Sequence, residues 1–134
     1  MAYGCQTWSL KASEERKIKV MQNSMQRSIL NIKIKDKVRV SKIRNILQSN
    51  IDFLHAIRRL KWDWAGHVAR MGGNRWAKLL TDWIVLKKRK KGKQKKRWRD
   101  EIDNMLGHNC HHQIAQDRCE WMRLKEAFAQ QRAT

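Results

Sequence analysis

The sequence predicts an all-α fold, in which a small helical bundle is followed by a basic linker and C-terminal helices. Apolar residues recur at steps of three and four along much of the 134-residue chain, which is the period of an amphipathic helix. Capping residues precede several of these stretches, and glycine follows some of them. Residues 33–40 alternate between charged and apolar, but this short segment lies between helices and is interpreted as a connection. We expect five or six helices.

The first helix is expected to begin at Ser13, whose hydroxyl can cap free N–H groups ahead of Glu14 and Glu15. Residues 1–10 are short and partly aromatic, which indicates an extended piece of a larger core. Ser41 is expected to cap a second, short helix. The apolar stripe of the first helix comprises Ile18, Met21, Met25, Ile29 and Ile32.

The clearest helix is expected to begin at Asp52 and to stop at the turn Gly72-Gly73-Asn74. Gly66 within it either slightly destabilises the helix or marks a point where another helix approaches closely. His67 stands beside the apolar stripe, which favours a packed histidine over a metal ligand. The stripe comprises Phe53, Ile57, Leu60, Trp64, His67 and Met71.

Three further helices complete the prediction. They cover residues 75–86, residues 100–106 before Gly107, and residues 113–131 with Asp117 near the start. The segment after the linker is too small for a core of its own. The inward positions are Trp76, Leu79, Leu80 and Trp83 in the first of these helices and Ile114, Trp121, Leu124 and Phe128 in the last.

The composition points to a polyanionic partner. The chain has 31 Lys and Arg against 12 Asp and Glu, which gives a formal net charge of +19. Such a chain repels itself and attracts polyanions, so RNA or DNA is the expected partner. No window is long and apolar enough for a transmembrane helix, and the first twenty residues lack the pattern of a signal peptide. We expect a nuclear or cytoplasmic protein without a membrane partner or a small-molecule substrate.

Residues 87–99 hold ten of the cations in thirteen positions, and we interpret this run as a solvated linker. It could neutralise several phosphates without sequence choice, and its first four residues fit a nuclear-localisation signal. The alternative is a solubilising tether without a dedicated partner. The predicted contacts are Lys87, Lys88, Arg89, Lys90, Lys91, Lys93, Lys95, Lys96, Arg97, Trp98 and Arg99 in the run, with Arg58, Arg59, Lys61, Trp62 and Arg70 on the helix before it.

Tryptophans that stand among basic residues favour stacking on unpaired bases. Trp62 follows Lys61, and Trp98 lies between two arginines, so these two indoles are expected to be exposed. The core is expected to contain Trp64, Trp76, Trp83 and Trp121.

The sequence lacks the common signatures of an enzyme. It has no glycine-rich phosphate loop and no clustered carboxylates that could hold the two metal ions of a polymerase or nuclease. Cys110, His112 and Cys119 are weak candidates for a zinc site, but their spacing fits no zinc finger or knuckle. Adjacent residues point to different sides, so Cys110, His111 and His112 are not expected to converge on one ion. We predict no metal, no cofactor and no disulfide framework.

Short motifs in a fixed order carry a resemblance to one family. They are Tyr3-Gly4 with Thr7-Trp8, Gln26-Arg27 with Ile29-Leu30, Arg58-Arg59-Leu60-Lys61-Trp62, Gly66-His67-Val68-Ala69-Arg70-Met71, Arg75-Trp76 with Trp83, Gly92 with Arg97-Trp98, Asp100 and Ile102, and Ala115-Gln116-Asp117-Arg118 with Trp121 and Glu126-Ala127. In this order they resemble the C-terminal end of the endonuclease-reverse transcriptase of non-LTR retrotransposons. The chain departs from that family at the linker, where Gln94 stands in place of a proline.

The resemblance implies a division of the chain. Residues 1–10 would be a remnant of the palm boundary, residues 11–71 a thumb-like helical bundle and residues 72–86 a short helix. Residues 87–99 would be the basic linker and residues 100–134 the C-terminal helical tail. This region would grip template and primer, but it contains neither the palm's metal-binding aspartates nor the endonuclease residues, so we expect no enzyme activity from it on its own.

Two other interpretations stay open. The chain could be a non-enzymatic protein-interaction module, or an inert fragment that self-associates through the surface that would face the palm. The basic first helix could lie on a membrane surface, although such a helix is more often packed with a solvated face.

Overall fold

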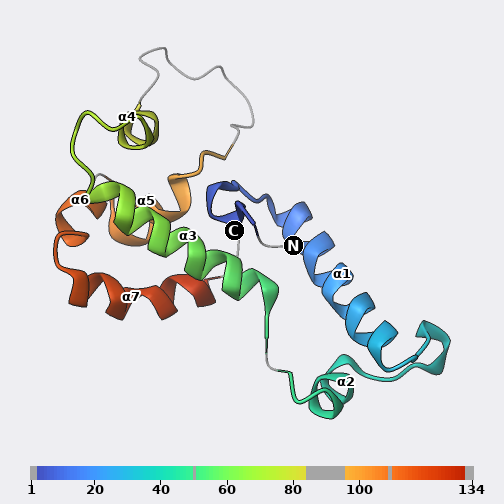
Figure 1. Cartoon of the computed structure of the whole chain (residues 1–134). Coiled ribbons are helices and arrows are strands. Elements are labelled where there is room, and N and C mark those ends of the chain that lie inside the picture. Colours follow the sequence, from blue (N-terminus) through green and yellow to red (C-terminus); the bar gives the residue numbers. More distant parts are fainter. Residues whose placement is uncertain (1–2, 50, 84–95, 109, 132–134) are drawn as a thin grey trace.

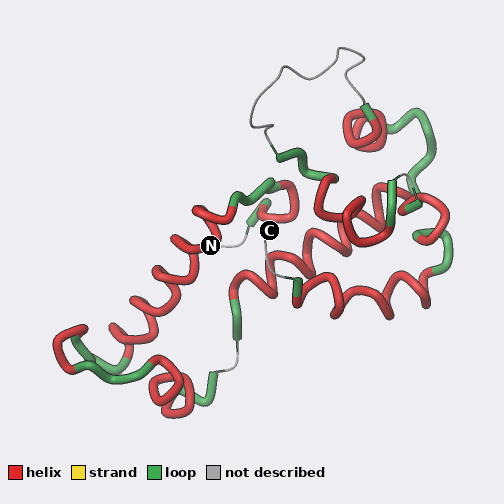
Figure 2. The backbone as a smooth tube through the Cα atoms, turned by 180° about the vertical axis from the view of Figure 1, so that it is seen from behind, coloured by secondary structure: helices red, strands yellow, loops and turns green. Residues whose placement is uncertain are grey.

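The computed structural model of the chain describes residues 3–49, 51–83, 96–108 and 110–131. Within these ranges there are seven α-helices, two short 3-10 helices and no strand, which confirms the predicted all-α class (Figure 2). None of the described helices is long and apolar enough to cross a membrane. In chain order the elements are η1 (Cys5–Thr7), α1 (Ala12–Ile29), η2 (Ile34–Asp36), α2 (Val40–Ile46), α3 (Phe53–Ala69), α4 (Trp76–Asp82), α5 (Asp100–Leu106), α6 (His111–Ile114) and α7 (Arg118–Gln130).

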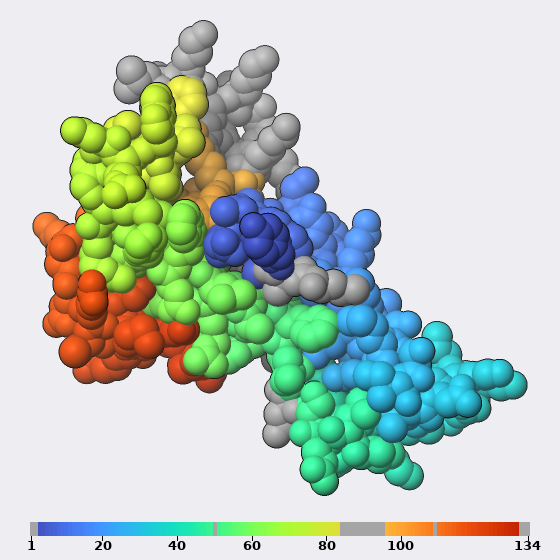
Figure 3. Space-filling model, in the orientation of Figure 1, coloured from blue at the N-terminus to red at the C-terminus, as the bar shows by residue number. Residues whose placement is uncertain are grey.

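The helices form a body with a projecting arm. Residues 11–49, which include α1 and α2, make the arm, and they extend away from the remaining helices (Figures 1 and 3). In the body α3 and α7 lie side by side, as the views from both sides show. The helices α4 and α6 also contact α3, and α5 contacts α6. The long helix α3 is therefore the element on which the others are assembled.

Two indoles form the centre of the body. The rings of Trp62 on α3 and Trp121 on α7 are buried and stacked, with centroids 4.1 Å apart. The Trp62 indole N–H donates to the backbone oxygen of Trp121 at 2.8 Å, and the Trp121 indole N–H donates to the backbone oxygen of Trp62 at 3.2 Å. Phe128 packs against the Trp62 ring at a centroid distance of 4.8 Å. The pair buries a large apolar surface while both polar N–H groups are satisfied.

The C-terminal helices share this core with α3. Ile102 of α5 and Ala115, which follows α6, are completely buried in the same cluster as Trp62 and Trp121. Burial against α3 gives these short helices the apolar contacts that their own length could not supply.

The buried face of α3 differs from the predicted stripe. Leu60 is 43% exposed and His67 is exposed, so the expectation of a packed histidine is wrong. The face toward α7 instead combines Trp62 with the small residues Ala65 and Gly66. A pattern of large apolar side chains misses this face because the close approach of α7 requires small residues. The predicted role of Gly66 as a point of close helix approach is confirmed by its contact with the Trp121 indole.

The predicted ends of several helices are confirmed. The Asp52 side chain accepts the backbone N–H of Leu54 at 2.9 Å, as expected for the residue that caps α3. Gly107 ends α5 with a φ of +88°, a conformation that favours glycine. The single helix expected over residues 113–131 is wrong, because the chain turns after α6 and Asp117 caps a new helix by accepting the Cys119 N–H at 2.9 Å.

The arm packs on the body through polar side chains. Glu15 on α1 pairs with Arg58 on α3 at 2.7 Å, and the buried Gln22 bonds the backbone on both sides of the α3 start. The predicted apolar stripe of α1 does not form its buried face, because Met21 and Ile29 are 40% and 70% exposed. The helix begins at Ala12 and α2 begins at Val40, so Ser13 and Ser41 lie inside the helices rather than at their caps.

Residues 3–10 pack against the body. Cys5 is completely buried against Leu54 and Ile57 of α3. The Trp98 indole N–H donates to the backbone oxygen of Gln6 at 2.7 Å. The segment forms a 3-10 turn rather than the extended piece that we expected, and it joins α3 to the residues that precede α5.

Candidate nucleic-acid interface

Most described cations among the predicted nucleic-acid contacts are paired with carboxylates or a backbone oxygen of the protein itself. Their partners are Glu15 for Arg58 (2.7 Å), Glu126 for Arg59 (3.1 Å), Glu101 for Lys61 (2.6 Å) and for Lys96 (2.5 Å), Asp103 for Arg99 (2.9 Å), and the backbone oxygen of Ala115 for Arg70 (2.8 Å). Each pair joins different elements or fixes one of their ends, so these cations position the helices. The predicted contacts Lys87, Lys88, Arg89, Lys90, Lys91, Lys93 and Lys95 lie outside the described residues.

Lys61 and Trp62 are not surface contacts. Lys61 is 2% exposed and Trp62 is fully buried, so the expectation that this indole is available to unpaired bases is wrong. The reason is that α3 is covered on two sides here, since Lys61 bonds Glu101 of α5 while Trp62 stacks on α7. A basic neighbour in the sequence therefore does not indicate an exposed indole on this helix.

The acceptor shared by two of these cations is the carboxylate of Glu101. Its oxygens lie 2.6 Å from Lys61 Nζ and 2.5 Å from Lys96 Nζ. Burial opposes ionisation of Glu101, but the two ammonium groups outweigh it and hold the pKa of the carboxyl below its ordinary 4.5. Burial also lowers the pKa of Lys61 below 10.5, and Glu101 opposes that change. Lys61 Nζ further lies 5.4 Å from the centroid of the Trp98 ring, within cation–π range. Trp98 is partly buried against the core, so its predicted exposure is wrong as well.

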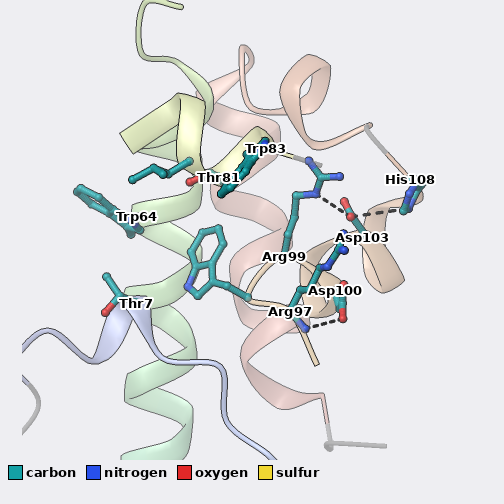
Figure 4. A pocket seen from close by; sticks show the side chains of 11 residues that line it. Thr7, Trp64, Thr81, Trp83, Arg97, Arg99, Asp100, Asp103 and His108 are labelled. Atoms are coloured by element: carbon teal, nitrogen blue, oxygen red, sulfur yellow. Dashed lines mark hydrogen bonds and ion pairs between the residues drawn. The ribbon is translucent and has the colours of Figure 1, made fainter. Parts of the chain in front are cut away.

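A cavity of about 720 Å³ opens beside Trp98, between the end of α4, α3 and the residues that lead into α5 (Figure 4). Three indoles line it, those of Trp64, Trp83 and Trp98. Arg97 and Arg99 contribute basic groups to its wall, which Figure 4 shows next to the acidic side chains of α5. The remaining lining residues are Thr7, Leu80, Thr81, Asp100, Asp103 and His108.

The two arginines of the cavity are held differently. Arg99 is mostly buried, and its Nε lies 2.9 Å from Asp103 Oδ2, which His108 also approaches at 3.7 Å. Arg97 is exposed, and its backbone N–H donates to the Asp100 carboxylate at 2.7 Å. Arg97 is therefore a solvent-accessible cation of the cavity wall, which a phosphate can approach.

The exposure of Trp76 and Trp83, at the two ends of α4, reverses the sequence prediction. Trp76 is 77% exposed and Trp83 is 70% exposed, so the expectation that they are core residues is wrong. The helix α4 has only seven residues, and Lys78 ties it to the end of α3 by donating to the backbone oxygens of Ala69 and Met71. The apolar side of α4 is left largely uncovered. The sequence feature that could have indicated the exposure of Trp83 is its nearness to the basic run, which begins four residues later.

The arm carries a second basic surface, whose tip is not among the predicted nucleic-acid contacts. Eleven Lys or Arg stand against three acidic residues between Lys11 and Arg44. The segment around η2 forms the tip of the arm (Figure 3), and the cations there are exposed. The exposed members there are Lys33, Lys35, Lys37, Arg39 and Lys42. The alternating segment 33–40, which was interpreted as a connection, held the signal for this surface.

The three weak metal candidates are not brought together. Cys110 and Cys119 are exposed free cysteines, and Cys110 Sγ contacts the backbone oxygen of His108 at 3.6 Å. The third candidate, His112, has other neighbours. Its Nε2 lies 3.0 Å from Asp82 Oδ1, and its ring centroid lies 4.0 Å from that of His111. The expectation that adjacent histidines point apart is therefore wrong for this pair.

Together these features define a basic, all-helical protein with an aromatic cavity on its surface. No known family model matches the chain, and no solved structure matches it. Among curated proteins, it is similar to an uncharacterised transposon-derived protein of Caenorhabditis elegans, with 26% identity over 106 residues. The matched region covers 76% of this chain and 38% of that relative, so the chain spans well under half of the relative's length. The similarity is consistent with a transposon-related origin.

Proposed function

We propose that the chain is the thumb and tail region of a non-LTR retrotransposon reverse transcriptase, and that it binds RNA or DNA without sequence preference. The observation that carries the proposal is the cavity lined by Trp64, Trp83 and Trp98 together with the exposed Arg97. The transposon-derived relative and the net charge of +19 support it.

The cavity suits an unpaired base in particular. Every base has a π-face that can stack on an indole, and such stacking contributes about 1–3 kcal/mol per base without selecting a sequence. Arg97 offers an exposed cation to the adjoining phosphate, and the basic run 87–99 begins four residues after Trp83 in the sequence. Single-stranded nucleic acid is therefore the preferred substrate of the proposed interface.

A salt titration tests the proposal. Binding of a single-stranded oligonucleotide should weaken steeply as salt rises, because each phosphate contact releases counterions. Replacement of Lys87, Lys88, Arg89, Lys90 and Lys91 by glutamine should lower the slope of log K against log salt by up to about 3.5, at roughly 0.7 per contact. The control is Arg123→Gln on α7, whose cation is already paired with Glu120 at 2.7 Å, and it should leave the slope unchanged. Absence of binding at low salt would overturn the proposal.

The same proposal assigns no polymerase or nuclease activity to these residues alone. The motifs of the resemblance cover the part that holds nucleic acid, while the carboxylates that would bind catalytic metal ions belong to the palm and endonuclease. The nuclear-localisation pattern of Lys87-Lys88-Arg89-Lys90 further supports a nuclear or cytoplasmic location.

The exposed side of α4 favours self-association as a second candidate function. Trp76, Leu79 and Leu80 are 77%, 48% and 64% exposed, and contiguous apolar surface of this kind is typical of an interaction site. The discriminating measurement is the mass in solution at high salt. A stable dimer there, abolished by Leu80→Glu, would support apolar association, whereas a monomer would leave nucleic-acid binding as the function of this region.

A further inference from the structure

The start of α6 and the end of α4 bring three metal-binding side chains together. One ligand atom from each of Asp82, His111 and His112 lies within 4.8 Å of the others. The two histidines are the first residues of α6, and Asp82 is the last residue of α4. We propose that these three residues bind one divalent transition-metal cation, for which zinc is the best fit.

A second observation points to a ligand at this place. His111 is 3% exposed, and neither of its ring nitrogens has a hydrogen-bond partner among the described residues. The Nδ1 atom of His112 is buried and unpartnered as well. Buried polar atoms are almost always satisfied, because an unpaired one costs about 1–3 kcal/mol. A bound cation would satisfy nitrogens that the protein leaves without a partner.

A carboxylate stands beside one of the two histidines. Asp103 Oδ1 lies 3.5 Å from His111 Nδ1 without bonding it, and a carboxylate in that position can orient the ring of a metal-bound histidine.

The donor set argues for zinc. Imidazole nitrogens suit zinc, which also accepts a carboxylate, and zinc sites with three protein ligands keep water in the fourth position. Calcium and magnesium prefer oxygen ligands, so the two nitrogens disfavour them. Arg99 Nη1 lies 3.9 Å from Asp82 Oδ1, and the Asp103 carboxylate, 2.9 Å from Arg99 Nε, offsets that positive charge.

The proposed cation would join α4 to α6. The two helices are far apart in the sequence, and Asp82 directly precedes Trp83 of the aromatic cavity. A metal held by Asp82 would fix the end of α4 and with it the position of the Trp83 backbone. The metal site nevertheless stands independently of nucleic-acid binding, because its ligands do not depend on the occupant of the cavity.

Titration of the metal-free full chain with Co²⁺ and Zn²⁺ tests the site. We expect one Co²⁺ per chain with visible d–d bands but no sulfur-to-cobalt charge-transfer band, and one Zn²⁺ by calorimetry. Asp82→Asn and His112→Gln, both at half-exposed positions, should each weaken binding at least tenfold. The matched controls are His67→Gln, at an exposed histidine outside the cluster, and a Cys110→Ser, Cys119→Ser double variant, and both should bind as the parent does.

Several results would overturn the metal site. They are the absence of saturable binding by the parent chain, binding that survives both ligand substitutions, and binding lost in the cysteine variant. Circular dichroism of each variant separates lost ligation from lost folding. If Asp82→Asn unfolds the chain, the His112→Gln variant provides the test. Unchanged zinc binding by a folded His112→Gln variant would refute the site.

Discussion

Replacement of Gly66 by alanine is expected to lower the free energy of unfolding by about 1–3 kcal/mol, the usual effect of forcing an extra methyl group into a packed core. A Cβ atom at Gly66 would lie 2.4 Å from Trp121 Nε1 and 2.9 Å from two carbons of the same ring. The rigid indole cannot turn aside, because its N–H is bonded to the backbone of Trp62 and its ring is stacked on that residue. The helices α3 and α7 would have to separate.

The chain offers a matched control for this substitution. A Cβ atom at Gly72, just beyond α3, would meet no atom within 4 Å, so Gly72→Ala should change stability by less than about 0.5 kcal/mol. Urea unfolding followed by circular dichroism measures both variants. Equal stability of the two would contradict the close packing of α3 on the Trp121 indole.

Removal of the Glu101 carboxylate should lower the free energy of unfolding by a similar or larger amount. Glu101→Gln leaves the buried ammonium of Lys61 without its countercharge, and breaking a buried pair from one side costs about 3–5 kcal/mol. The additional replacement of Lys61 by methionine should restore most of the lost stability, because an apolar side chain in that position needs no countercharge. Failure of this rescue would contradict the ion pair as the cause.

The same carboxylate makes an acid-dependent contribution. The pKa of Glu101 is lower in the folded chain than its ordinary 4.5, so its stabilising effect is fully present above pH 4.5. It should decline as the pH falls from 4.5 through the lowered folded-state pKa. Denaturant midpoints measured between pH 7 and pH 3 should therefore drop less steeply for Glu101→Gln than for the parent. The control Glu120→Gln, which removes an exposed pair with Arg123, should follow the parent.

The fold class and the local signals at helix ends could be predicted from the sequence because they depend on neighbouring residues. Asp52 caps α3 and Gly107 ends α5 for reasons that lie within a few positions of each. The break that Asp117 makes was missed, since Ala115 is as acceptable inside a helix as in the buried turn where it lies. The pattern predicted a continuous helix because only tertiary packing distinguishes the two.

The buried faces could not be predicted from apolar periodicity, because polar groups form part of the contacts. Glu15 and Gln22 face α3 from the arm, and Lys61 faces α5, although a count of apolar residues places all three outside. Each becomes buried because a partner far away in the sequence satisfies it. The apolar periodicity of one helix cannot indicate such pairings, because the partner lies on another helix.

The sequence predicts the class of ligand for the candidate site but not the residues that form it. Charge density and tryptophans among basic residues indicated nucleic acid, yet Trp62 and Gly66, two residues of the family resemblance, form the contact with Trp121. That motif is therefore explained by helix packing. The exposed indole beside the cavity is Trp83, and only its nearness to the basic run indicated that it would remain uncovered.

The most direct test of the proposed interface compares Trp76, the first residue of α4, with Trp83, which directly follows the helix. Trp83 lines the cavity and Trp76 does not, although they are 70% and 77% exposed on the same segment. Affinity for a single-stranded oligonucleotide should fall roughly 5- to 150-fold in Trp83→Ala, as expected for a lost stacking energy of about 1–3 kcal/mol, with an unchanged salt slope. Trp76→Ala should bind as the parent does. Equal affinities of the two variants would contradict the cavity as the site that binds an unpaired base.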